Sequence, residues 1–151
     1  MRVKVIIIES AITDFLIINK LDRKQQRLMA NLVNVREATP YIVNAFNKRS
    51  KLRPRLRKFG IYVKLIFKDI QNLSQEEVYQ QMLDRYLKYI GWDDLQYIAF
   101  ITYSSEYTQI EIILNRVISG TKIIDLKCLK AGKKQYKMLH RASEEILSSS
   151  A

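Results

Sequence analysis

The chain has 151 residues, of which 48% are hydrophobic, and this is enough for one domain with a buried core. Its 26 Lys and Arg residues outnumber 15 Asp and Glu residues and give a formal net charge of +11, so a polyanion such as nucleic acid is an expected partner. The sequence predicts no membrane span, no signal peptide and no internal disulfide, since its apolar runs are short and Cys128 is the only cysteine, and we expect a cytoplasmic location.

The N-terminal part of the chain predicts two strands and a short helix. Residues 2–9 alternate into an apolar run that is typical of a buried strand, and residues 58–67 (KFGIYVKLIF) predict another. Residues 11–20 fit either a strand or a buried helix, because their apolar run has no clear period. Residues 40–47 predict a helix with Pro at its first position and Thr39 as its N-cap.

The C-terminal part predicts a helix, a β-hairpin and a closing helix. Ser74 and Glu77 form a capping box that begins the first helix, and Gly91 ends it. Two strands joined by a short polar turn are predicted over residues 96–117. The closing helix is predicted over residues 131–147, before a frayed tail at 148–151. The inward side chains expected on the two helices are Val78, Met82, Leu83, Tyr86 and Ile90, then Tyr136, Leu139, Ser143 and Ile146.

This order of elements predicts an α+β fold, an antiparallel sheet covered by helices, in a single domain of residues 1–151. The second hairpin strand alternates strictly, with Ile110, Ile112 and Leu114 on one face. The opposite face carries Tyr107, Gln109, Glu111 and Asn115. A polar row of this kind forms the floor of some sites, although a solvated sheet face is the commoner explanation.

The hairpin resembles the catalytic core of plasmid relaxases, the mobilisation nucleases that nick one DNA strand to begin conjugative transfer. In that family a strand carries R-H-x-D-x-x-H-x-H-x-H, then apolar residues and N-R-V, and its three alternating histidines hold a divalent cation. Asn115-Arg116-Val117 stand at the N-R-V position, and Gln96-Tyr97 match the usual lead-in. Weaker similarities to family motifs occur at Leu73-Ser74, at residues 91–94 (GWDD), at residues 120–122 and at Asn31-Leu32-Val33.

The residues that would carry relaxase chemistry are replaced. Asn19 stands at the position of the nucleophilic tyrosine, and no tyrosine precedes Tyr41. The three histidine positions hold Tyr107, Gln109 and Glu111, and the earlier arginine, histidine and aspartate positions hold Ile101, Thr102 and Ser104. The resemblance therefore implies a relaxase-like sheet without a catalytic residue, a bound metal or a cofactor.

Elementary chemistry supports the same expectation for the metal. Tyrosine is protonated and glutamine neutral at pH 7, so Glu111 is the only credible ligand on the strand. One carboxylate rarely holds Mg²⁺ or Mn²⁺, and a hydrogen bond or an ion pair, with Lys64 across the sheet as one candidate, is the simpler role. His140 is the only histidine, and its place in the closing helix does not suggest a general base.

Positive charge is concentrated between residues 48 and 58, where seven of eleven residues (KRSKLRPRLRK) are basic. Pro54 favours an extended loop, and closely spaced guanidinium groups suit phosphate contacts. A second basic zone runs over residues 122–141, and a solvated surface explains it equally well. The predicted nucleic-acid ligands are Lys48, Arg49, Lys51, Arg53, Arg55, Arg57, Lys58, Tyr62, Lys64 and Arg116.

These observations favour a DNA-binding protein that has lost nicking chemistry, an accessory factor in the mobilisation of a genetic element. Its expected partners are single-stranded or origin-like duplex DNA and an active relaxase, with Tyr62, Tyr103 and Tyr107 as stacking faces for unpaired bases. One alternative is an active nuclease that uses Glu111 and a displaced tyrosine. Another is an interaction module whose positive charge binds an acidic protein.

Overall fold

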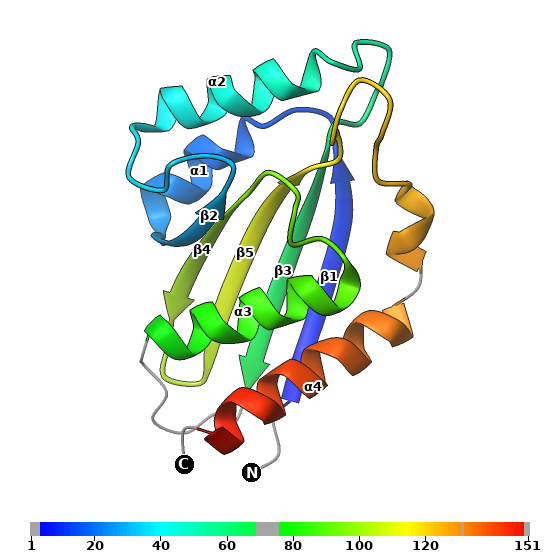
Figure 1. Ribbon diagram of the computed structural model, residues 1–151. Coiled ribbons are helices and arrows are strands. Elements are labelled where there is room, and N and C mark those ends of the chain that lie inside the picture. Colours follow the sequence, from blue (N-terminus) through cyan, green and yellow to red (C-terminus); the bar gives the residue numbers. More distant parts are fainter. Residues whose placement is uncertain (1–3, 69–75, 131, 150–151) are drawn as a thin grey trace.

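A five-stranded antiparallel sheet with the strand order β1-β3-β5-β4-β2 forms the middle of the computed structural model, which describes residues 4–68, 76–130 and 132–149 (Figure 1). The predicted α+β class and single domain are confirmed. The strands are β1 (Lys4–Ile12), β2 (Gln26–Asn31), β3 (Gly60–Lys68), β4 (Tyr97–Tyr103) and β5 (Tyr107–Asn115). The helices are α1 (Ile17–Lys24), α2 (Thr39–Ser50), α3 (Glu76–Ile90) and α4 (Gly132–Ser149), with a short 3-10 helix η1 (Leu126–Lys130).

Helices α3 and α4 cover one face of the sheet, the face turned toward the viewer in Figure 1. The alternation of β3 and β5 places their apolar positions on this face, as predicted. These residues pack with Met82, Leu83 and Tyr86 of α3 and with Leu139 of α4 in the main hydrophobic core. The core strand positions are Ile61, Val63, Leu65, Phe67, Ile110, Ile112 and Leu114.

Helices α1 and α2 cover only part of the opposite face, at the upper end of the sheet in Figure 1. Phe15, Ile18 and Phe46 pack there against Phe100 and Ile113 in a second hydrophobic cluster. The face that alternation predicted to be polar is therefore buried at one end of β5 and more open at the other. A face of this kind is neither a fully solvated surface nor a complete core.

The end of α3 is fixed by Gly91, as predicted from the sequence. Gly91 has φ of 77°, a left-handed conformation that costs glycine little. Its N–H donates to the carbonyl of Lys88 at 3.2 Å, and the N–H of Trp92 donates to that of Leu87 at 2.8 Å, which together make a Schellman motif. The predicted capping box begins at Ser74, which lies outside the described residues.

Several predicted element boundaries and one predicted inward side chain are wrong. Residues 11–20 contain the end of β1 and the start of α1 rather than one element, and β2 was not predicted at all. Tyr136 is not an inward residue of α4: it is 37% exposed and its hydroxyl accepts the N–H of Ile7 at 3.1 Å. The frayed tail does not begin at residue 148, because α4 continues to Ser149.

Thr39 is not the N-cap of α2, because the cap position is Ala38 and no side chain caps the helix. The Thr39 hydroxyl instead joins an ion pair between Asp22 of α1 and Arg27 of β2. Arg27 binds both carboxylate oxygens of Asp22, at 2.6 and 3.0 Å, and this bond lowers the pKa of the carboxyl. The cluster connects α1, β2 and the start of α2, so a residue predicted to cap one helix helps to join three elements.

No helix in the described part of the chain has the length and apolar character that crossing a bilayer would require.

The first prediction concerns Gly60, where β3 begins. A Cβ atom at this position would lie 2.7 Å from Cε1 of Phe15 and 2.8 Å from Cγ1 of Ile12. Because both neighbours are packed, we expect Gly60→Ala to lower the free energy of unfolding by about 1 to 3 kcal/mol in urea denaturation. Gly132→Ala is the control, since open space surrounds Gly132, and it should cost nothing. Equal stability of the two variants would contradict this packing.

Candidate nucleic-acid interface

The predicted N-R-V motif begins with a fully buried amide. Nδ2 of Asn115 donates to the carbonyl of Phe46 at 3.1 Å and to Oε1 of Gln96 at 2.9 Å. Its Oδ1 accepts the N–H of Val117 at 3.0 Å. Asn115 has no exposed surface, so these bonds satisfy an amide that has no access to water. They connect the last turns of α2 to the end of β5.

Arg116 is a structural residue here and not the DNA ligand that the sequence suggested. Its side chain is 6% exposed, and its burial lowers the pKa of the guanidinium. Nη1 donates to the carbonyl of Lys58 at 2.6 Å, and Nε donates to that of Ile124 at 2.9 Å. The half-buried Arg49 acts similarly, with Nη1 on the carbonyl of Ile118 at 2.9 Å. Both arginines hold the connection after β5 against the segment between α2 and β3.

The segment between α2 and β3 carries the predicted basic cluster, and we define the basic loop as residues 48–58. It is not extended, as Pro54 had suggested, but folds into turns. The N–H groups of Leu52, Arg53 and Leu56 donate to the carbonyls three residues earlier, at 3.0 to 3.2 Å. Its exposed cations are Lys48, Lys51, Arg55, Arg57 and Lys58, while Arg53 is half-buried.

No acidic residue stands within or next to the loop in the sequence, because the chain has no Asp or Glu between Ala38 and Lys68. The hydrogen bonds from Arg49 and Arg116 fix the loop at both ends. The loop therefore presents several cations from a fixed backbone.

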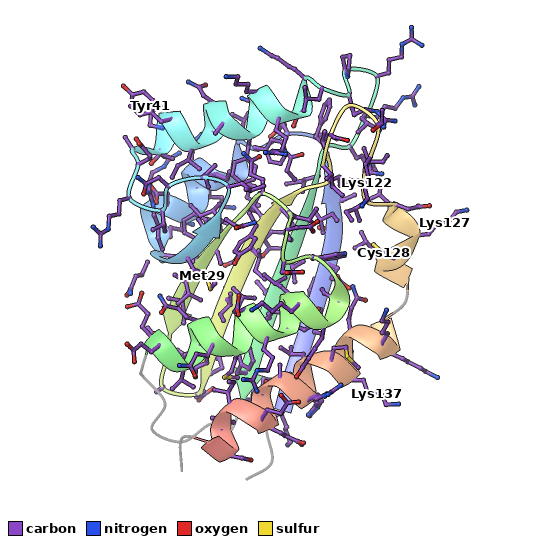
Figure 2. The ribbon with its side chains drawn as sticks, in the orientation of Figure 1. Met29, Tyr41, Lys122, Lys127, Cys128 and Lys137 are labelled. Carbon is purple, nitrogen blue, oxygen red and sulfur yellow. The ribbon has the colours of Figure 1, made fainter. Side chains whose placement is uncertain are left out.

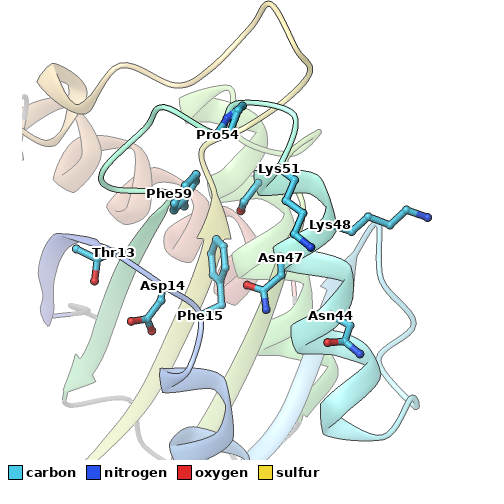
Figure 3. Close-up of a pocket in the computed structure, with 10 residues that line it drawn as sticks. Thr13, Asp14, Phe15, Asn44, Asn47, Lys48, Lys51, Pro54 and Phe59 are labelled. Atoms are coloured by element: carbon cyan, nitrogen blue, oxygen red, sulfur yellow. The ribbon is translucent and has the colours of Figure 1, made fainter.

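A groove of about 650 Å³ lies beside the basic loop (Figure 3). Asp14 and Thr13 lie on one side of it, and Asn44 and Asn47 of α2 lie on the other, with the Phe15 and Phe59 rings between them. Lys48 and Lys51 also line the groove, so the basic loop forms part of its rim. The sequence did not reveal this groove, because three separate segments of the chain build it. The remaining lining residues are Ser50 and Pro54.

The second basic zone lies along the same edge of the molecule. Figure 2 shows Lys122, Lys127 and Lys137 one after another from the neighbourhood of the basic loop down to α4. All three are exposed, as are Lys133 and Lys134 of α4. Arg141 differs, because it pairs with Glu145 at 2.9 Å and lies over the ring of Tyr89.

Glu111 lies on the polar face of β5, and both of its carboxylate oxygens accept hydrogen bonds. It is 6% exposed and accepts hydrogen bonds from Oη of Tyr62 at 2.5 Å, Nε2 of Gln25 at 2.5 Å and Nε2 of Gln109 at 2.6 Å. Burial, and then the bond to Glu111, raises the pKa of Tyr62. Lys64 is the cross-strand neighbour of Glu111, but no ion pair joins them in the described residues. Hydrogen bonds thus occupy the carboxylate that was the only candidate metal ligand.

The other predicted site residues do not gather around the basic loop. Asn19 is half-buried in α1, and its carbonyl accepts a bond from Arg23. Ser104 closes the turn between β4 and β5 by binding the backbone of Tyr107. Tyr107 begins β5 and Asn115 ends it, so eight strand steps of about 3.4 Å separate the exposed Tyr107 from the loop by roughly 27 Å.

Thr102 and Tyr103 lie at the same distant end of the sheet, in β4. Thr102 is half-buried, and Tyr103 is 36% exposed and makes an edge contact with Tyr79. Within residues 4–68, 76–130 and 132–149, no three His, Cys, Asp or Glu side chains come together as a metal site would require. The predicted site residues therefore fall into two separate groups, and the group on the basic loop lies at the rim of the groove shown in Figure 3.

Glu9 is a half-buried acid that was not predicted from the sequence. It lies on the face of β1 that α3 and α4 cover, where Nε2 of Gln135 donates to it at 2.7 Å. Burial raises its pKa to about 7, and its charge contributes to the raised pKa values of Tyr86 in α3 and Cys128 in η1. The signal available in the sequence was an acid that alternates with the apolar residues Val5 and Ile7 on the same face of the predicted strand.

Comparison of the chain with protein-family models, with curated proteins and with solved structures finds no match. The similarity to relaxases therefore stays a prediction from sequence motifs.

The second prediction concerns the buried amide. Asn115→Ala leaves Oε1 of Gln96 and the N–H of Val117 without this partner and removes one of the bonds to the Phe46 carbonyl, and we expect it to lower the free energy of unfolding by about 2 to 3 kcal/mol. Trypsin should also cut the basic loop faster, because its anchor at α2 is lost. The exposed Asn44→Ala is the control and should change neither readout. Unaltered proteolysis in Asn115→Ala would contradict the anchoring role.

The third prediction concerns the pH dependence of stability. The pKa of Glu9 in the folded protein, about 7, lies above the ordinary glutamate value of 4.5, so the folded state holds this proton more tightly than the unfolded state. The contribution of protonated Glu9 to the free energy of unfolding is therefore fully present below pH 4.5 and is lost as the pH rises to about 7. Urea midpoints of wild type should therefore fall, relative to those of Glu9→Gln, between pH 4.5 and 7. A difference between the two urea midpoints that stays the same from pH 4.5 to pH 7 would contradict the raised pKa of Glu9. Glu106→Gln, in the exposed hairpin turn, is the control and should show no such trend.

Proposed function

We propose that the protein binds DNA through the basic loop and does not nick it. The observation that carries this proposal is the set of exposed cations on a loop that is held at its start by hydrogen bonds of Arg49 and Asn115 and at its end by a hydrogen bond of Arg116. Charged groups on a fixed backbone lose less conformational entropy on binding than those on a flexible arm. The fixed spacing of these cations therefore supports a role in phosphate binding rather than a set of solvated charges without a ligand.

The chemistry of the polar sheet face supports binding rather than cleavage. Glu111 uses its oxygens to accept three hydrogen bonds, and the neutral amide of Asn19 stands at the predicted nucleophile position. An amide does not attack phosphorus as a tyrosine hydroxyl does. The protein would thus keep a DNA surface without the covalent step.

We assign the protein a role as an accessory factor in the mobilisation of a genetic element, and this part of the proposal depends on the relaxase resemblance. The N-R-V residues have a structural task in this chain, since Asn115 and Arg116 position the basic loop. This structural role does not depend on catalysis, so the N-R-V residues can be retained in a protein that no longer cuts DNA. An active relaxase that supplies the nicking step is the expected protein partner.

The fourth prediction tests the loop. Each cation that neutralises a phosphate adds about 0.7 to 0.9 to the slope of log affinity against log salt. Changing Arg55, Arg57 and Lys58 together to Gln should therefore weaken binding to every DNA sequence and lower that slope by about 2 to 3 units. Fluorescence anisotropy at several salt concentrations measures both effects. The fold should survive, because all three side chains are exposed.

A charge-matched control separates the loop from net charge alone. The exposed Lys20, Lys24 and Arg36 lie on α1 and on the loop before α2, and their change to Gln removes the same charge. This control should keep most of the affinity. Equal losses in both variants would show that only net charge matters, and no DNA binding by wild type would overturn the proposal. Supercoiled plasmid with Mn²⁺ should give no covalent adduct, and an adduct would favour the nuclease alternative.

A further inference from the structure

We propose that the groove beside the basic loop holds one unpaired base of a DNA strand whose phosphates lie on the loop. This inference rests on the proposed function and names the form of DNA that the same site recognises. The groove volume of about 650 Å³ lies within the range of small-molecule sites, so it admits a nucleotide. A base that remains paired in a duplex cannot enter it.

The groove contains an apolar surface suited to a base. Phe59 is half-buried and leaves part of its ring at the groove, where a base can stack on it. Phe15 forms a firm floor: it is 1% exposed and packs against Phe46 with ring centroids 5.0 Å apart. Stacking on an aromatic ring tolerates any base, because every base has an apolar face.

Polar groups stand on both sides of this aromatic surface. Asn44 and Asn47 are one helical turn apart on α2, both are exposed, and neither side-chain amide bonds to another described residue. Asp14 faces them across the groove in Figure 3. Its Oδ1 accepts the N–H of Leu16 at 2.9 Å, and its Oδ2 accepts no hydrogen bond from the described residues. Amide and carboxylate groups match the donors and acceptors of a Watson–Crick edge, which only an unpaired base exposes.

The cations at the rim are placed for the backbone of the same strand. In Figure 3 the Lys51 side chain runs along the groove wall toward Asn47, whereas Lys48 extends outward from α2. One lysine is thus near a nucleotide in the groove, and the other is placed for a neighbouring phosphate. Positive charge beside an uncharged aromatic wall is the combination found in surfaces that bind single-stranded nucleic acid.

The test compares one single-stranded oligonucleotide with a blunt duplex of the same length. The double variant Asn44→Ala, Asn47→Ala should bind the single strand about five- to tenfold more weakly, because two hydrogen-bonding groups are lost. Its affinity for the duplex and its salt slope should stay unchanged. Both substitutions place Ala on an exposed helix face, so the fold is retained. Gln81→Ala, an exposed amide on α3, is the matched control.

A second readout uses 2-aminopurine at one position of the single strand, whose fluorescence falls when the base stacks. Wild type should quench it, and Phe59→Leu should quench it less while binding the duplex normally. If wild type binds both DNA forms and the asparagine variant loses nothing on the single strand, the inference is wrong and the proposed function stands. If wild type binds neither form, the proposed function itself fails.

Discussion

The amide of Asn115 is buried without contact with water, and its bonds to Phe46, Gln96 and Val117 join β5 to the end of α2. The position of the basic loop depends on this joint, because the loop starts in the last turn of α2. Arg116 then holds the far end of the loop through the carbonyl of Lys58. Two adjacent residues, the last of β5 and the one after it, therefore set the geometry of a surface that lies at a distance from them in the sequence.

This arrangement separates two regions that both contain residues predicted from the sequence as candidate site residues. The polar face of β5 is closed by the bonds of Glu111 to Tyr62, Gln25 and Gln109, whereas the exposed cations lie beyond the other end of the strand. Buried polar groups are costly unless they are satisfied, and hydrogen bonds here satisfy the carboxylate. The Glu111 network stabilises the sheet, and the groove and the loop remain free to bind.

The sequence predicted those features that depend on local periodicity. Alternation in β3 and β5 indicated their buried faces because an antiparallel strand exposes every second residue to each side. It did not predict β2, in which Leu28 is the one fully buried side chain, and it did not predict the turns of the basic loop. The position of the loop depends on Arg49 and Arg116, whose side chains bind the carbonyls of Ile118 and Lys58 far away in the sequence, and no local pattern encodes such contacts. Arg116 was likewise expected at the surface, because its charge was visible and its burial was not.

Photo-cross-linking tests the central claim most directly, since it locates DNA on the protein without any substitution. A single-stranded oligonucleotide with 5-iodouracil forms cross-links with nearby aromatic side chains, and mass spectrometry identifies the peptides. The account predicts cross-links to the peptide that contains Phe59, beside the basic loop and the groove. Cross-links confined to Tyr103 and Tyr107, at the opposite end of the sheet, would contradict it.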